Sequence, residues 1–150
     1  MIPYLLDKTS DFGPVLRLIQ SEFAYMEGRI DPPSSMRDLT EQALAAAPEV
    51  WALGDPPVAC MVLTPKDNFL YLGKLAVAAD HRGQGLARRL VTLAEERAAT
   101  LGLAGVELQT RIELVENQQA FRAMGFAETA RTAHKGYASP TSITFRKERP

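Results

Sequence analysis

The hydrophobic pattern of the N-terminal region alternates between a short strand-like run and helical spacing. Residues 2–7 form a brief apolar run that predicts a strand. Ser10 or Asp11 is placed to cap a helix whose apolar positions recur at helical spacing as far as Gly28. A stretch rich in proline and serine, RIDPPSS, then interrupts the pattern, and residues 36–47 resume it. This region therefore predicts strand, helix, loop and helix.

Three further strands are predicted in the middle of the chain. The segments EVWAL (49–53) and PVACMVL (57–63) are short, apolar and separated by GDPP, which indicates an antiparallel hairpin. Asp67 and Asn68 mark the next turn, and a third apolar segment, FLYLGKLAV (69–77), follows it.

The remaining pattern adds helices between strands. Apolar residues at helical spacing from Gly83 to Leu101 predict a long amphipathic helix that ends at Gly102. The later segments predict, in order, a strand, a helix and two strands over residues 106–110, 115–124, 126–132 and 142–147. Strands followed by helices, with one strand–helix–strand crossover, are typical of an α/β or α+β fold with a mixed sheet.

Length and composition narrow the class of protein. With 150 residues, the chain is expected to form a single domain over residues 1–150. Seventeen Lys and Arg balance eighteen Asp and Glu, and no block of like charge suggests binding to nucleic acid. No apolar stretch approaches the roughly 20 residues that a membrane-spanning helix requires, and the first residues do not resemble a secretory signal. We expect a soluble, cytoplasmic protein that does not bind membranes.

The chain has one cysteine, Cys60, which lies within the apolar segment VACMVL. A single cysteine cannot form an internal disulfide bond. Its apolar surroundings favour a buried structural thiol over a nucleophile.

The segment most informative about chemistry is LYLGKLAVAADHRGQGLARRLV, in which a strand enters a glycine-containing loop and then the long helix. The first backbone N–H groups of a helix lack internal partners and lie at the positive end of its dipole, so they can bind a pyrophosphate. Gly83 and Gly85 allow the backbone to approach the anion closely, and Arg82 and Arg88 add charge-assisted contacts. The same glycines also suit a simple strand-to-helix turn.

The spacing of this loop differs from that of the common nucleotide-binding motifs, G-x-G-x-x-G and G-x-x-x-x-G-K-[ST]. It instead resembles the R/Q-x-x-G-x-G/A signature of the GNAT acetyltransferase superfamily, with an L-x-V strand before it. The segment ENQQAFRAMGF resembles that family's helix after the fifth strand, through Asn117, Phe121, Gly125 and Phe126. The two markers together cover residues 70–126.

The resemblance implies a GNAT-like fold with a mixed, mostly antiparallel sheet and helices on both faces. It also implies an N-acetyltransferase that uses acetyl-CoA, without a metal, and acetylates a primary amine of a small molecule or peptide by direct attack on the thioester. The family pattern gives these expected cofactor-binding residues: Leu75, Ala76, Val77, Arg82, Gly83, Gln84, Gly85, Leu86, Ala87, Arg88, Asn117 and Phe121. Relatives occur as monomers and homodimers, and both states are compatible with the sequence.

The catalytic acid and base are less clear from the sequence. Family members often carry a tyrosine as proton donor where this chain has Phe121, which leaves Tyr137, Tyr71 or water as the donor. Glu107 is a candidate base, because it is the one acidic residue inside a predicted core strand. In the family, the strand before the glycine-containing loop splays from its neighbour, and a backbone N–H of that strand, at Val77, would stabilise the oxyanion.

Other candidates lie in the loops and helices. Glu113 and Glu116 flank the second marker helix and could act as a base through water, and of the two histidines His134 is a stronger candidate than His81. By resemblance, the acceptor would contact the first two helices and the late hairpin, including Tyr25 and Glu27, and an acidic lining would suit an amine. The alternative function is a non-catalytic acyl-CoA-binding sensor or interaction module, because Phe121 cannot donate a proton.

Overall fold

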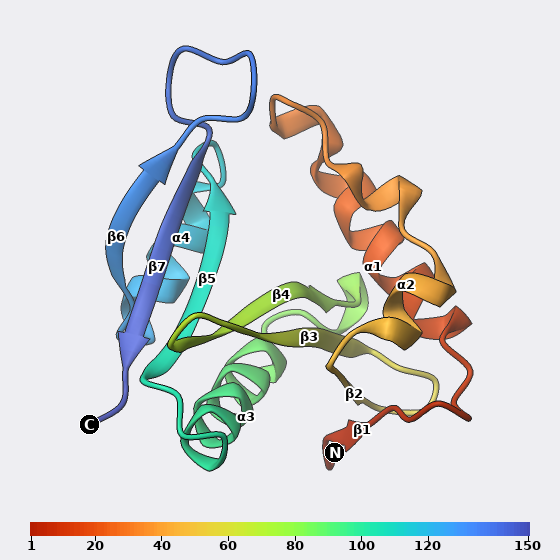
Figure 1. The fold of residues 1–150 in the computed structure, drawn as a ribbon. Helices are drawn as coiled ribbons and strands as arrows, with labels where there is room; N and C mark the ends of the chain where they lie inside the picture. The colour runs from red at the N-terminus through yellow and green to blue at the C-terminus, as the bar shows by residue number, and fades with distance from the viewer.

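One seven-stranded sheet organises the chain, with the strand order β1-β2-β3-β4-β5-β7-β6. The computed structural model describes residues 1–150, and its strands are β1 Tyr4–Leu5, β2 Glu49–Leu53, β3 Ala59–Lys66, β4 Phe69–Val77, β5 Gly105–Arg111, β6 Ala127–Thr132 and β7 Ser142–Glu148 (Figure 1). All neighbouring strands are antiparallel except β4 and β5, which are parallel. The predicted mixed, mostly antiparallel sheet is confirmed.

Helices cover both faces of this sheet, as expected (Figure 1). The α-helices are α1 Gly13–Met26, α2 Glu41–Ala46, α3 Leu86–Thr100 and α4 Val115–Ala123, and three short 3-10 helices cover Glu27–Arg29, Ser35–Asp38 and Ala79–His81. Val15 and Ile19 of α1 pack with Val50, Cys60 and other residues of β2–β4 in one buried cluster.

A larger core lies on the opposite face of the sheet. There Leu90 and Ala94 of α3 pack against inward-facing residues of β3, β4, β5 and β7, including Leu70, Leu108 and Phe145. Burying two apolar helix faces against the two faces of one sheet removes them from water and is the main source of stability for such a layered fold.

Several element boundaries differ from those predicted. The helix predicted over residues 36–47 is wrong as a continuous element, because Leu39 and Thr40 are extended and separate a 3-10 turn from α2. The Thr40 hydroxyl accepts a hydrogen bond from the Ala43 backbone N–H (3.1 Å) and so starts a new helix. The strand predicted over residues 2–7 is limited to β1, and the N-cap of α1 is Phe12 rather than Ser10 or Asp11.

The Cys60 thiol is buried, as predicted, with no exposed surface. Burial raises the pKa of this thiol to about 12, so that only roughly 1 in 10,000 molecules carries the reactive thiolate at pH 8. We expect the native protein to resist alkylation by iodoacetamide at pH 8 and the guanidinium-unfolded protein to react stoichiometrically. Mass spectrometry measures both states, and rapid labelling of the native protein would contradict the buried position.

Candidate functional site

The two central strands of the sheet diverge along their length. Parallel pairing of β4 with β5 extends only over Phe69–Tyr71 and Gly105–Glu107. Beyond this point β4 remains paired only with β3, and β5 only with β7. Lys74 forms a bulge in β4 with a left-handed backbone (φ 52°). The facing edges of β4 and β5 therefore lack a strand partner beyond this short pairing.

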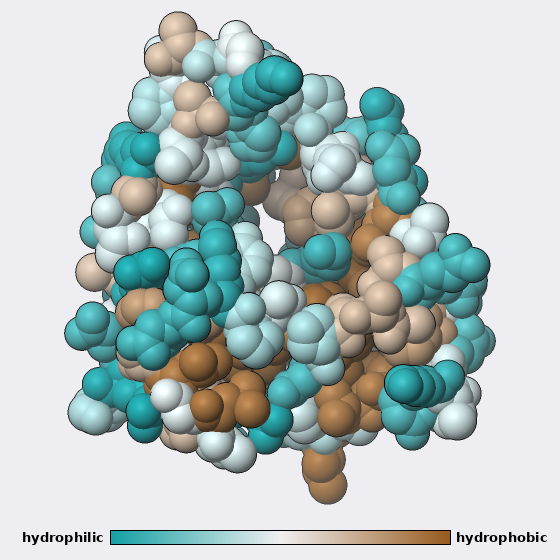
Figure 2. All heavy atoms as spheres, viewed as in Figure 1, coloured by the Kyte–Doolittle hydropathy of each residue, from teal (hydrophilic) through white to brown (hydrophobic).

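A cavity of about 580 Å³ lies where the strands diverge. This volume is within the range of small-molecule sites, roughly 300–1,000 Å³. Its walls come from β4, β5, α1 with the loop that follows it, the first turn of α3, and α4. Figure 2 shows the surface hollowed between the half of the molecule formed by β5–β7 and the half formed by α1. Residues far apart in sequence thus meet around one opening.

The N-terminus of α3 forms one end of this site. Helix α3 begins at Leu86 rather than at the predicted Gly83, because Gly85 is its N-cap in the left-handed conformation (φ 77°). No side chain caps the helix, and no first-turn residue is acidic. Gly83 also has a positive φ of 76°, and no neighbouring atom lies within 4 Å of the Cβ position at either glycine. The free N–H groups and open backbone suit an anion such as pyrophosphate.

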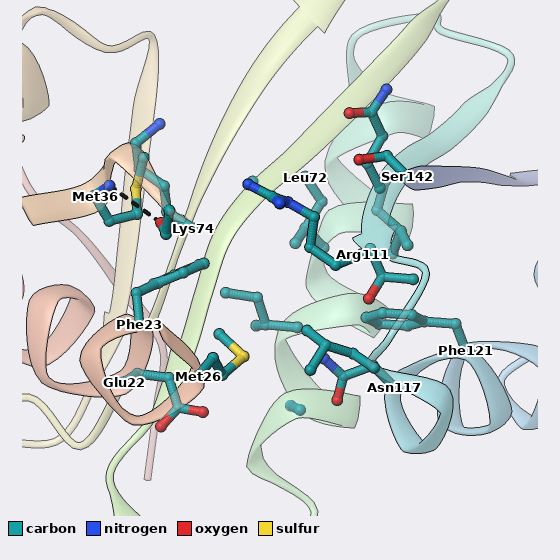
Figure 3. A pocket seen from close by; sticks show the side chains of 18 of the residues that line it. Glu22, Phe23, Met26, Met36, Leu72, Lys74, Arg111, Asn117, Phe121 and Ser142 are labelled. Atoms are coloured by element: carbon teal, nitrogen blue, oxygen red, sulfur yellow. Dashed lines mark hydrogen bonds between the residues drawn. The ribbon is translucent and has the colours of Figure 1, made fainter. Parts of the chain in front are cut away.

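Six of the residues expected to bind the cofactor line the cavity: Leu75, Val77, Arg82, Ala87, Asn117 and Phe121. Figure 3 shows Asn117 and Phe121 of α4 on the same side of the cavity as Leu72. The other six lie outside the lining. Gly83, Gln84, Gly85 and Arg88 lie exposed at the loop and helix start, whereas Ala76 and Leu86 are buried in the two cores.

Arg82 contacts α1 in this structure. Its guanidinium forms an ion pair with Glu22 and lies 4.7 Å from the centre of the Tyr25 ring. Both α1 residues line the cavity. Arg82, in the loop before α3, therefore connects this loop to α1 at the edge of the cavity.

Glu107 does not line the cavity. Its side chain is 5% exposed, one carboxylate oxygen lies 3.3 Å from the Lys66 Nζ, and the other accepts a hydrogen bond from the Arg146 Nε at 2.8 Å. This ion-pair network accounts for an acidic residue inside a core strand. The candidate base is thus engaged by two cations from β3 and β7.

The substitution Glu107→Gln tests whether this residue is structural. We expect it to lower the free energy of unfolding by about 2 kcal/mol, because two cations lose a charged partner. The loss falls short of that for a fully buried pair, since Lys66 and Arg146 are partly exposed. Thermal and urea unfolding measure it, with Glu96→Gln on the exposed face of α3 as control. Unchanged stability with a large loss of activity would instead favour the catalytic role.

The candidate tyrosines have different positions. The Tyr137 hydroxyl donates a hydrogen bond to Asp31 (2.6 Å), which raises the pKa of the phenol and joins the β6–β7 loop to the loop after α1. Tyr137 does not line the cavity, whereas Tyr71 does. Burial, and then the charge of Glu107, raise the pKa of the Tyr71 phenol, which therefore keeps its proton at neutral pH.

The histidines are also separated. His134 lines the cavity, and its Nδ1 is hydrogen-bonded to the Thr141 hydroxyl. His81 lies outside the lining, with its Nδ1 2.9 Å from Asp80. Of the two, only His134 can therefore face a molecule bound in the cavity.

Among the residues expected to contact an acceptor, Tyr25 lines the cavity, whereas Glu27 lines a separate small cavity of about 240 Å³. Glu116 lines the main cavity and is ion-paired with Arg29. Glu113 does not line it, and one of its oxygens accepts a hydrogen bond from the Asp31 backbone N–H (2.9 Å). The expected acidic lining is therefore reduced to carboxylates already engaged by arginines.

Sequence reasoning missed several polar residues of the cavity, among them Lys74, Thr110 and Arg111. The Thr110 side chain is 7% exposed, and its hydroxyl has no hydrogen-bond partner in the protein. Arg111 ends β5 and donates a hydrogen bond to the Pro32 carbonyl (2.5 Å). The only sequence signal was their position at strand ends and bulges, where side chains often face a site.

A model of the acetyltransferase (GNAT) family matches residues 15–126 of this chain. No curated protein sequence is significantly similar to it. Among solved structures, a Klebsiella pneumoniae protein classed as an acyl-CoA N-acyltransferase is 20% identical with a TM-score of 0.70, and the match covers 98% of this chain and 96% of the other. A chain of the NatC complex bound to Gag peptide and CoA is 20% identical (TM-score 0.69; 99% and 98% covered).

A third structure, a Bacillus anthracis protein classed as a streptothricin acetyltransferase and bound to acetyl coenzyme A, is 18% identical with a TM-score of 0.61. Here the match covers 67% of this chain and 62% of the other.

No helix is long and apolar enough to cross a membrane. No group of three or more His, Cys, Asp and Glu side chains is arranged to hold a metal ion.

Proposed function

The chain belongs to the acetyltransferase (GNAT) family, and on that premise we propose that it transfers an acetyl group from acetyl-CoA to the primary amine of a small molecule or peptide. One observation carries the proposal: β4 separates from β5 directly beside the uncapped N-terminus of α3. This arrangement combines a groove with free backbone edges and a site for a pyrophosphate. Both are needed to hold a CoA thioester.

The residues present fit the cosubstrate. The unpaired edge of β4 from Leu72 to Val77 offers backbone groups to the pantetheine arm, and the buried, unpartnered Thr110 hydroxyl faces the same cavity. The open glycines and free N–H groups before α3 suit the pyrophosphate. Asn117 adds an amide at the α4 wall. The pantetheine arm and the pyrophosphate thus each have complementary groups in this chain.

Acetyl-CoA supplies an activated acetyl thioester, which an unprotonated amine can attack directly. A backbone N–H of β4, at Val77, stabilises the oxyanion, because such donors are fixed before charge develops. His134 accepts the amine proton: its imidazole lines the cavity, forms no ion pair, and is held at Nδ1 by the Thr141 hydroxyl. The cavity carboxylates Glu22 and Glu116 are held by arginines.

The substitution His134→Gln tests this role. We expect kcat/KM for the amine to fall by about 100-fold at neutral pH, the usual contribution of a positioned base. The deficit should shrink at higher pH, where more of the amine is already unprotonated. Steady-state kinetics over a pH series measures it, with His81→Gln, outside the cavity, as the matched control. A variant as active as the wild type at neutral pH would exclude His134 as the base.

The function itself is tested by incubating the protein with acetyl-CoA and a panel of amines, and measuring free CoA and acetylated products by mass spectrometry. Acetylated amine in excess over enzyme supports the proposal. The alternative is a non-catalytic acyl-CoA sensor, which Phe121 favours because its ring lines the cavity without a hydroxyl. Tight binding of acetyl-CoA by calorimetry, with no product from any amine, would establish that alternative.

A further inference from the structure

The charges that line the cavity do not balance. Two carboxylates face it, Glu22 and Glu116, and each is ion-paired with an arginine, Arg82 and Arg29 respectively. Two other cations also line it, Lys74 and Arg111, and neither forms an ion pair within the protein. Among the side chains that line the cavity, cations therefore outnumber carboxylates, while Asp31 and Glu113 lie near Arg111 outside the lining.

Arg111 is partly buried. Burial lowers the pKa of its guanidinium, while the nearby carboxylates of Glu113 and Asp31 act in the opposite direction. The Tyr137 hydroxyl donates to Asp31, and the Asp31 backbone N–H donates to one oxygen of Glu113, whose other oxygen has no hydrogen-bond partner. The Arg111 guanidinium has five N–H donors, of which one bonds to the Pro32 carbonyl. A partly desolvated guanidinium with spare donors is a site for an anion.

Arg111 and the start of α3 belong to different parts of the fold. Arg111 ends β5 and is bonded to the loop after α1, whereas the free N–H groups belong to the start of α3. Figure 3 shows its side chain reaching from β5 toward the wall that carries Phe23, Met36 and Lys74. Arg111 and the start of α3 are thus contributed to the cavity by different elements.

One wall of the cavity is apolar. Phe23 and Met26 of α1 line the cavity together with Leu114, and they pack in one small cluster. Thioether and aromatic side chains adapt to compact apolar groups. Since the same 580 Å³ must also hold the acyl end of the cosubstrate, the space left for an acceptor suits a small molecule.

We propose that the acceptor is a small amine that also carries a carboxylate and a compact apolar substituent, an amino-acid-like molecule, and that Arg111 binds its carboxylate with help from Lys74. This inference rests on the proposed acetyl transfer. The planar guanidinium donates two parallel N–H groups to a carboxylate. A simple alkylammonium ion would add a further positive charge beside these two cations, whereas a carboxylate balances one of them.

A matched pair of acceptors tests the proposal: L-leucine and 3-methylbutylamine, which share the amine and the apolar chain but differ by the carboxylate. With the wild-type protein we expect kcat/KM for leucine to exceed that for the amine by about 10- to 100-fold, as for other hydrogen bonds to charged groups. In Arg111→Met this ratio should fall close to one, and in Lys74→Met it should fall part of the way. Thermal melting and CoA calorimetry show whether each variant is folded.

The outcomes separate this inference from the proposed function. If the wild type acetylates both compounds equally, or prefers 3-methylbutylamine, the carboxylate site is overturned while acetyl transfer stands. If neither these two nor any amine of the wider panel is acetylated although acetyl-CoA binds, the proposed function itself fails. Since Arg111→Met also removes the contact to Pro32, a poorly folded variant would leave Lys74→Met, which removes no such contact, to decide the question.

Discussion

The substitution Ala87→Glu is expected to weaken CoA binding by about 1,000-fold while leaving the fold intact. Ala87 lies in the first turn of α3 and lines the cavity. A carboxylate there occupies the place of the pyrophosphate and repels it, and like charges brought together at a site cost several kcal/mol. The same carboxylate interacts favourably with the helix dipole, and should raise the stability of the unliganded protein by about 0.3–1 kcal/mol.

This prediction is specific because CoA affinity should fall while the stability of the unliganded protein rises. Calorimetry with CoA measures the loss of affinity, and urea unfolding measures the gain in stability. The control is Ala87→Gln, which has nearly the same size without the charge and should lose much less affinity. An Ala87→Glu variant that binds CoA like the wild type would show that the anion does not lie at the start of α3.

The glycine-containing loop before α3 was predictable from sequence because its backbone geometry is local. A strand followed by glycines and a helix start is encoded within one short segment, and Gly83 and Gly85 do have positive φ. The fold class was predictable for a similar reason, since the hydrophobic pattern follows the period of each element. The helix over residues 36–47 failed because Thr40 can cap a helix as well as continue one, and here it caps.

The rest of the site depends on contacts between distant segments. Glu107 is ion-paired with Lys66 and Arg146, which are 41 and 39 residues away in sequence, and no local sequence pattern indicates such partners. Tyr137 likewise bonds to Asp31 across 106 residues. Arg111 gave no signal because its importance comes from the charges around it rather than from its neighbours in the chain. The position of Arg111 beside the cavity therefore depends on the folded arrangement of β5 and the loop after α1.

The position at which β4 and β5 diverge depends on Gly105, at the junction of β4, β5 and β7. This residue pairs with Phe69 on one side and with Glu148 on the other. A Cβ atom added to it would lie 2.1 Å from the Lys147 carbonyl oxygen and 2.8 Å from the Glu148 Cα. Both are backbone atoms of β7, which cannot rotate away as the end of a side chain can.

The substitution Gly105→Ala should therefore force β7 away from β5, and we expect it to lower the free energy of unfolding by roughly 4 kcal/mol, above the usual cost of overpacking. The melting temperature should fall by roughly 10 °C. Calorimetry measures both, and Gly28→Ala serves as control because nothing lies within 4 Å of its Cβ position. CoA affinity should fall as well, since β5 forms one wall of the groove. Stability equal to that of the control would mean that β7 can yield, and that the strand junction does not determine the shape of the site.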